Sequence, residues 1–275
     1  MNAHAAVDDP ASDELLFTTD EAGLARIVLN RPQARNALTF AMYRGLVTCC
    51  ERIAQDPSVK VLIITGAGDK AFAAGTDIGQ FRAFETAEDA LGYERFMDQV
   101  LGSLERLRVP TIAAIAGACT GGGAAIAAAC DLRIATRDAR FGFPIARTLG
   151  NCLSQGNLKR LSNLIGPARV KDILFTARLV GADEALAIGL VGEVVEDRAA
   201  LTDRVEALAT LFAGHAPLTM QATKEGLRRL SEEEPAPDGA AHPGDDLILM
   251  CYMSGDFREG MEAFLGKRAP KWTGR

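Results

Sequence analysis

The sequence predicts an α/β fold with parallel strand pairing. Short runs at 59–65 and 111–116 are apolar nearly throughout, which is typical of strands covered on both faces. Amphipathic segments at 36–54 and 88–107 precede these runs, with apolar residues recurring at helical spacing. Because short strands that alternate with helices favour parallel pairing, these observations indicate the fold class.

The remaining elements of the N-terminal half follow in order. Residues 14–30 predict a hairpin with a turn at Asp20 to Gly23. Pro57 ends the first helix. Beyond the second helix, the pattern predicts a strand at 111–116, a helix at 121–129 and a strand at 131–136.

The pattern becomes helical from about Ser154. The expected elements are helices at 154–165, 167–176 and 183–188, a strand at 191–195, and helices at 199–213, 217–230, 246–254 and 256–265. The segment 232–246, rich in Pro, Gly and acidic residues, predicts a mobile surface loop. We therefore expect a flexible tail at 1–12, a core at 13–195 and a helical C-terminal part at 196–275, packed on the core or on a neighbouring subunit.

Composition narrows the classes of function. The chain has 275 residues, is 48% hydrophobic and 24% charged, and carries a net charge of −6. This charge disfavours nucleic acid or an anionic membrane as a partner, and no apolar run approaches the length of a membrane span.

Cysteines and histidines point to neither disulfides nor metal. Six cysteines without a CxxC pair, and an N-terminus without a signal-peptide pattern, predict reduced, mostly buried thiols and a cytoplasmic location. The three histidines, His4, His215 and His242, lie far from the other chemically distinctive segments, so we expect neither a metal site nor a histidine base.

Two glycine-rich turns carry the chemical signal. They span 70–78 and 117–131, and each follows an apolar strand-like run. The second opens a small-residue helix at Gly121 to Gly123, where backbone N–H groups stay uncovered at the positive end of the helix dipole. A second exposed N–H from the first turn would complete a two-donor site for an oxyanion. The alternative is that these glycines serve only tight turns and close packing.

The first turn also has a competing interpretation. Residues 66–71 fit the pattern G-x-G-x-x-A after a strand, as in nicotinamide dinucleotide sites. Such a motif should open a long amphipathic helix, whereas a short glycine-interrupted segment follows here. A nicotinamide enzyme therefore stays as an alternative that a failure to bind NAD(H) or NADP(H) would remove.

Several segments in order resemble one family. Residues 29–38, 59–82, 109–143, 181–195 and 266–275 together resemble the enoyl-CoA hydratase/isomerase (crotonase) superfamily. The resemblance implies a spiral of ββα units with a helical trimerisation part, and a homotrimer or dimer of trimers. It also implies an acyl-CoA thioester as substrate, with CoA part of that substrate and no separate cofactor.

Mapped onto this sequence, the resemblance implies an oxyanion hole and a CoA site. The oxyanion donors would be the N–H groups of Thr76 and Gly122. Backbone carbonyls near Ala73 and Ala74 would meet the adenine, and Arg35 would face the phosphates or be a solvated surface arginine.

Two further residues have open assignments. Lys267, in the basic C-terminal end, is either a solvated lysine or a phosphate contact, within its own subunit or to a neighbouring one. Asp77, beside the implied CoA site, is expected to fix its own turn rather than to perform chemistry.

The sequence departs from the family's hydratases at both catalytic glutamate positions. Ala125 and Ile145 stand where the resemblance implies the acid and base, and neither side chain transfers a proton. A positioned acid or base commonly contributes about 10²–10⁴-fold, so efficient hydration by the usual route is not expected.

Polar residues of the segment 146–157 are candidate substitutes. Cys152 is a candidate nucleophile or proton donor or a pocket-lining thiol, and Arg147 would hold an acyl carboxylate or form a structural ion pair. Ser154 is a further polar group near the expected pocket. A non-catalytic CoA-binding scaffold is the alternative from a different class.

Overall fold

The computed structural model describes residues 13–232 and 242–275, and its main sheet has six strands. Their order is β1 (Leu15–Thr19), β2 (Leu24–Leu29), β3 (Val61–Gly66), β5 (Thr111–Ile115), β7 (Leu132–Thr136) and β10 (Glu193–Val195). β1 pairs antiparallel with β2, and every other neighbour pair in this sheet is parallel. The predicted hairpin and the parallel α/β class are confirmed.

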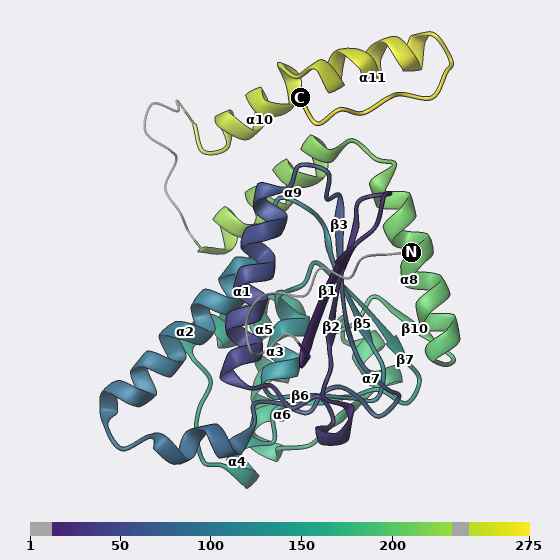
Figure 1. Ribbon diagram of the computed structural model, residues 1–275. Coiled ribbons are helices and arrows are strands. Elements are labelled where there is room, and N and C mark those ends of the chain that lie inside the picture. Colours follow the sequence, from purple (N-terminus) through teal and green to yellow (C-terminus); the bar gives the residue numbers. More distant parts are fainter. Residues whose placement is uncertain (1–12, 233–241) are drawn as a thin grey trace.

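Helices cover both faces of this sheet. α1 (Phe40–Gln55), α2 (Ala87–Glu105) and α3 (Gly122–Ala129) lie on one side, and α8 (Arg198–Ala213) lies on the other; Figure 1 shows α1 and α8 flanking the strands. Alternate residues of β3 enter the two packing layers: Leu62 joins the layer of α1, and Ile63 joins that of α8. The uninterrupted apolar run of β3 is therefore the result of burial on both faces.

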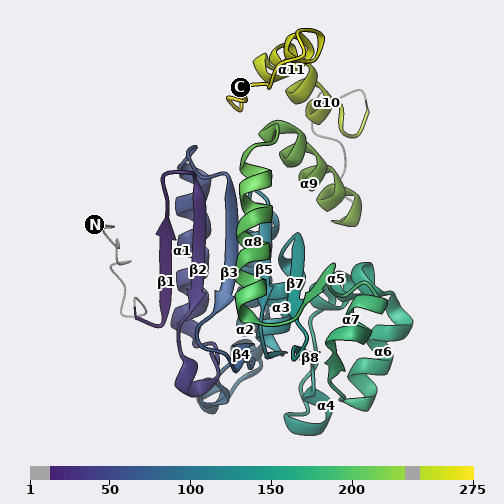
Figure 2. The same ribbon diagram turned by 90° about the vertical axis from the view of Figure 1, so that its right-hand side faces the viewer.

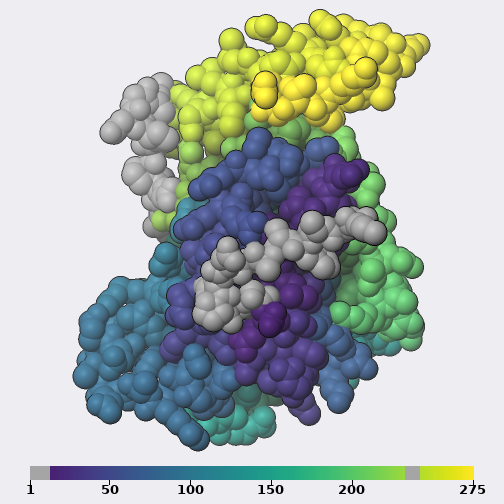
Figure 3. Space-filling model, in the orientation of Figure 1, coloured from purple at the N-terminus to yellow at the C-terminus, as the bar shows by residue number. Residues whose placement is uncertain are grey.

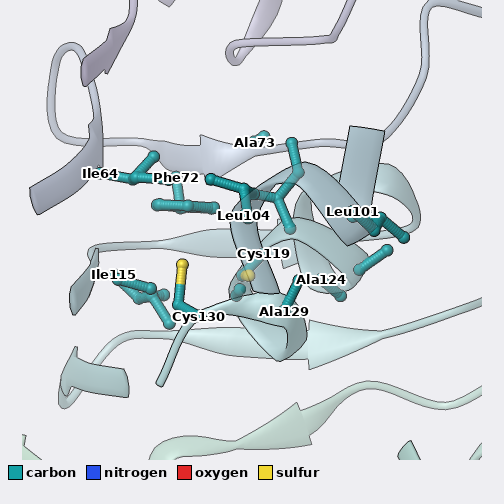
Figure 4. Close-up of a cluster of buried hydrophobic side chains, with 14 of the residues drawn as sticks. Ile64, Phe72, Ala73, Leu101, Leu104, Ile115, Cys119, Ala124, Ala129 and Cys130 are labelled. Atoms are coloured by element: carbon teal, nitrogen blue, oxygen red, sulfur yellow. The ribbon is translucent and has the colours of Figure 1, made fainter. Parts of the chain in front are cut away.

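The core beneath α3 is built largely from small side chains. Figure 4 shows Cys119 and Cys130 beside Ile64, Phe72 and the alanines around them. A Cβ built on Gly123 would lie 2.5 Å from Ala73 O, so only glycine permits this approach of α3 to the neighbouring strand.

A second, smaller sheet was missing from the prediction. It contains β4 (Ala71–Ala73), β6 (Ala118–Thr120), β8 (Arg140–Gly142) and β9 (Val180–Gly181), in that order. β4, β6 and β8 pair parallel, and β9 is antiparallel to β8. The interpretation of 70–78 and 117–121 as turns alone was thus incomplete, because strands of two or three residues are too short for hydrophobic periodicity.

The C-terminal part of the chain is mostly helical. The elements are α4 (Ile145–Thr148), α5 (Gln155–Ile165), α6 (Pro167–Thr176), α7 (Ala182–Ala187), α9 (Pro217–Glu232), α10 (Asp245–Tyr252) and α11 (Gly255–Leu265). In Figures 1 and 3, α10 and α11 lie beyond α9, at the opposite end from α4. α8 follows β10 near the predicted boundary at 195.

Two predicted segments lie wholly or partly outside the residues that the structure describes. The tail 1–12, and 233–241 of the predicted loop at 232–246, lie outside the described residues, and α10 already begins at Asp245. Among the described helices, none combines the length and the apolar character needed to cross a membrane.

The first helix begins later than predicted because Asn36 has another role. Asn36 is fully buried with φ 55°, and its Nδ2 donates to Ala67 O (2.9 Å) and Ala71 O (2.7 Å). Its Oδ1 accepts from Arg31 N at 3.0 Å. α1 then starts after Thr39, whose hydroxyl caps Met42 N. Asn36 therefore ties the loop before α1 to the β3–β4 connection.

We expect Asn36→Ala to lower the free energy of unfolding by about 2–4 kcal/mol, because each buried group that loses its partner costs about 1–3 kcal/mol. Urea unfolding measures this. The control is Asn163→Ala, which removes one exposed hydrogen bond to Ser231 and should change stability by less than about 0.5 kcal/mol. Equal effects of the two substitutions would contradict the role given to Asn36.

Candidate active site

The two glycine-rich segments meet at the end of the small sheet. Ala73 of β4 is in register with Cys119 of β6, and the two strands are parallel. Their carboxyl ends therefore lead into adjacent turns, one through Gly75 (φ 105°) and one through Gly121 (φ 52°). A Cβ built on Gly75 would lie 3.9 Å from Gly122 N, which shows how closely the turns approach.

Each turn leaves one backbone N–H without an acceptor. Gly75 O accepts from Leu38 N (2.8 Å), and Asp77 N donates to Leu38 O (2.9 Å), so the chain is fixed on either side of Thr76 N. Gly122 begins α3, and its N-cap residue Gly121 provides no side-chain acceptor. Among the described residues, neither Thr76 N nor Gly122 N donates a hydrogen bond.

A cavity of about 250 Å³ opens in front of these turns. Of the residues singled out in the sequence, Ala74, Thr76, Gly122, Ala125, Ile145 and Cys152 line it. The same wall contains Tyr43 from α1, and Tyr93 and Glu94 from α2. The structure thus brings both glycine turns to one cavity, together with Ala125 and Ile145, the positions that lack the family's glutamates.

Three hydroxyl groups form a chain along the wall of this cavity. Tyr43 Oη lies 2.8 Å from Thr76 Oγ1, which lies 3.1 Å from Tyr93 Oη. Burial raises the pKa of both tyrosines above the ordinary value, so both phenols stay neutral near neutral pH. A Cβ on Gly122 would overlap the Tyr43 hydroxyl, so a tyrosine at position 43 requires glycine at position 122.

Sequence reasoning missed Tyr43, Tyr93 and Glu94. All three lie on helices whose apolar spacing predicts core packing. A usable signal existed for the tyrosines, because a buried phenol requires a hydrogen-bond partner.

The other predicted pocket groups have different surroundings. Arg147 is exposed on α4 and is not among the residues that line the cavity. Ser154 is also absent from the lining; it caps α5 by accepting from Asn157 N (3.2 Å) and donates to Asp98 Oδ1 (3.0 Å). Cys152 is exposed at the cavity.

Asp77 and Asp131 have structural partners. Asp77 begins the 3-10 helix η2 (Ile78–Ala83), where it accepts from Gly79 N and from Arg31 Nη1, both at 3.1 Å. Asp131 accepts from Thr111 and from Lys224 of α9, the latter at 2.8 Å. The expectation that Asp77 fixes its own turn agrees with these bonds.

A second cavity, of about 230 Å³, lies on the other side of the β3–β4 connection. Arg35, Asp69 and Lys70 supply its charged groups. Lys267 follows α11 and is exposed, with φ 50°. Figures 1 and 2 place α11 at the opposite end of the molecule from α4, and Lys267 lines neither cavity.

The structure also bears on metal and dinucleotide sites. The described residues include no group of three or more His, Cys, Asp or Glu side chains that could hold a metal ion. Residues 66–71, the competing dinucleotide motif, lead into strand β4 rather than a helix. A helix N-terminus that could receive a pyrophosphate is therefore missing directly after this motif.

Known proteins match nearly the whole chain. The family described as enoyl-CoA hydratase/isomerase matches residues 19–275. The crotonyl-CoA hydratase of Syntrophomonas wolfei is 35% identical over 255 residues, which are 93% of this chain and 96% of that protein. The short-chain-enoyl-CoA hydratase of Clostridium acetobutylicum is 36% identical over 248 residues, covering 90% of this chain and 93% of that one.

A solved structure agrees with the fold. The enoyl-CoA hydratase/carnithine racemase from Magnetospirillum magneticum superposes with a TM-score of 0.88 at 36% identity, covering 96% of each chain. The resemblance drawn from the glycine turns is therefore confirmed, as is the crotonase fold. The chain belongs to the enoyl-CoA hydratase/isomerase family and is an enzyme of hydratase/isomerase type.

Proposed function

We propose that this enzyme binds an acyl-CoA thioester and stabilises its enolate with the N–H groups of Thr76 and Gly122. The observation that carries the proposal is a pair of backbone donors without acceptors, on adjacent turns that line one cavity. Preorganised donors of this kind lower the energy of a developing oxyanion without reorganisation during the reaction. The N-terminus of α3 adds the positive end of its dipole.

The hydroxyl chain supports this role for the backbone of Thr76. Because Tyr43 and Tyr93 hold the Thr76 hydroxyl, that hydroxyl does not fold back onto its own N–H group. A bound carbonyl oxygen would then be the acceptor that both N–H groups lack.

The CoA portion would follow the outer side of the β3–β4 connection. Carbonyl groups near Ala73 and Ala74 would accept from the adenine, and Arg35 would donate to phosphate. The cavity containing Arg35 and Lys70 supports this placement, because it holds cationic groups beside the same connection. Asp77 would position the turn rather than contact the ligand.

A homotrimer or a dimer of trimers would complete the molecule. Large apolar side chains are exposed along the C-terminal helices, among them Leu227, Leu230, Ile248, Leu249, Tyr252 and Phe264. Clustered exposed apolar groups are typical of subunit interfaces. Lys267 would then contact a neighbouring subunit's CoA phosphate, since it lines neither cavity of its own chain. We place the protein in the cytoplasm, in keeping with its six free cysteines.

With Ala125 and Ile145 at the two glutamate positions, this chain lacks the side chains that transfer protons during hydration. Both line the cavity, and neither has a titratable group. Hydratase activity is stated in the names of the relatives themselves. For this chain we propose that an enolate forms and that hydration of an enoyl-CoA is inefficient. A non-catalytic CoA-binding scaffold is the second candidate, favoured by the same two residues.

Calorimetry with butanoyl-CoA and crotonyl-CoA tests the binding step. We expect saturable binding of both thioesters and none of NAD(H) or NADP(H). The absence of acyl-CoA binding would overturn the proposed function, whereas binding without turnover of any enoyl-, hydroxyacyl- or dicarboxyl-CoA would favour the scaffold.

The fit between Gly122 and Tyr43 gives a test of the oxyanion hole. Gly122→Ala should lower kcat by about 10²–10³-fold, the usual effect of losing one oxyanion donor, because the added methyl displaces the Tyr43 hydroxyl and shifts the turn. Adding Tyr43→Phe removes the overlapping oxygen and should restore much of the loss. Steady-state kinetics with a thioester that the wild-type enzyme converts measures kcat for the single and the double variant.

The matched control is Gly92→Ala on α2, where a new Cβ would meet only the end of Arg95 at 4.0 Å. It should leave kcat unchanged. A double variant no better than Gly122→Ala alone would contradict the proposed fit.

The rate at which Cys152 is alkylated tests whether a ligand occupies the cavity. It is exposed, whereas burial raises the pKa of Cys49 and Cys130 to about 12 and that of Cys50 to about 11, which leaves those thiols unreactive. We expect iodoacetamide to label Cys152 first in the native protein. Butanoyl-CoA at about 100 times its Kd should slow this labelling about 100-fold, because the free fraction is then about 1%.

Mass spectrometry of the labelled peptides follows the reaction, with Cys251 as the internal control. Cys251 does not line the cavity, so its labelling rate should not depend on the thioester. Equal labelling of Cys152 with and without saturating ligand would exclude the cavity as the acyl site.

A further inference from the structure

One face of α2 forms a wall of the cavity. Tyr93, Glu94, Met97 and Leu101 all line it, at positions that share a face of the helix. A capping box, in which Thr86 and Asp89 bond each other's backbone N–H groups, sets where the helix begins. Burial of Val100 and Leu104 in the core fixes its rotation. Glu94 is thereby held at the cavity by a regular element rather than by a loop.

Glu94 differs from the other acidic residues of α2. Glu88 pairs with Arg95, Asp89 belongs to the capping box, Asp98 accepts from Ser154, and Glu105 pairs with Arg160. Among the described residues, Glu94 has neither a hydrogen bond nor an ion pair, although its side chain is half-buried. A carboxylate without a partner, beside an apolar cavity, carries a desolvation cost that its packing does not offset.

The cavity lining holds no other group suited to take a proton from carbon. It contains one carboxylate, Glu94, and no histidine, lysine or arginine among the described residues. The remaining titratable groups are two neutral phenols, whose pKa values are raised by burial, and the exposed thiol of Cys152. Burial also raises the pKa of Glu94, with the nearby Asp98 charge adding to the effect, and a carboxylate of raised pKa is a stronger base.

We propose that Glu94 is the catalytic base of this enzyme, acting from α2 in place of the side chains missing at Ala125 and Ile145. This inference rests on the proposed function. The Glu94 carboxylate takes a proton from the carbon next to the thioester carbonyl. The electron pair of that C–H bond forms a C=C bond to the carbonyl carbon, and the carbonyl π pair becomes the oxyanion held by Thr76 N and Gly122 N.

The carboxylic acid of Glu94 then returns the proton. If the proton of the Glu94 carboxylic acid has exchanged with solvent in the meantime, its return to the same carbon completes exchange of the α-proton. If the proton is instead delivered to a carbon conjugated with the enolate, a double bond of the acyl chain changes position. The step needs no oxidant, reductant or second substrate, and it uses the cavity residues of one chain.

Exchange of the α-protons of butanoyl-CoA in D₂O, followed by proton NMR, isolates this step. The wild-type protein should exchange them, and Glu94→Gln should slow exchange by about 10²–10⁴-fold, the usual contribution of a positioned base. The Kd for butanoyl-CoA should change little, because the amide keeps the size of the side chain. Glu94→Asp should retain part of the activity.

The matched control is Glu88→Gln on the same helix, a residue whose exposed side chain pairs with Arg95 and does not line the cavity. It should exchange at the wild-type rate. Wild-type exchange in Glu94→Gln, or tight binding without exchange by the wild-type protein, would overturn the assignment while leaving thioester binding intact. Failure of the wild-type protein to bind butanoyl-CoA would instead overturn the proposed function.

Discussion

The parallel register between β4 and β6 is the constraint on which the candidate site depends. It aligns two strands of three residues, so that both turns leave the sheet at the same edge. Backbone groups can approach this closely only where side chains are absent, and Gly75, Gly121 and Gly122 meet that requirement in different ways. Two have positive φ, and the third lies against a tyrosine hydroxyl. The larger sheet supplies the rigid support, because its central strands β3 and β5 are buried on both faces.

The long elements could be predicted from sequence because each carries its own physical signal. β3 is apolar on both faces, α1 is amphipathic with a Thr39 cap, and α6 begins at a proline. The small sheet could not be predicted in this way, because its strands are too short to show a period. The start of α1 was wrong because Asn36, which a helix would tolerate, instead makes buried hydrogen bonds to carbonyls more than thirty residues away.

The approach of the two glycine-rich segments could be predicted from the sequence, whereas the helix faces that border the cavity could not. The glycine spacing indicated exposed backbone N–H groups, and the family resemblance implied Thr76 and Gly122 as the two donors, which remain a proposal. Tyr43 and Glu94 are ordinary positions of amphipathic helices until the fold determines which helix face borders a cavity. Arg147, Cys152 and Ser154 were chosen for their position in the chain, and of these the cavity lining includes Cys152.

The chain of hydroxyls has a consequence for hydrogen-bond donation. Tyr43, Thr76 and Tyr93 have three hydroxyl hydrogens in total. Two of these hydrogens form the two hydrogen bonds that join the three hydroxyl groups. One hydrogen always remains. If Thr76 donates to Tyr43, the tyrosine on α1 keeps the free hydrogen; if Thr76 donates to Tyr93, the tyrosine on α2 keeps it. Rotation of three hydroxyls, with every heavy atom at rest, therefore moves a free donor along the cavity from the α1 side of the chain to the α2 side.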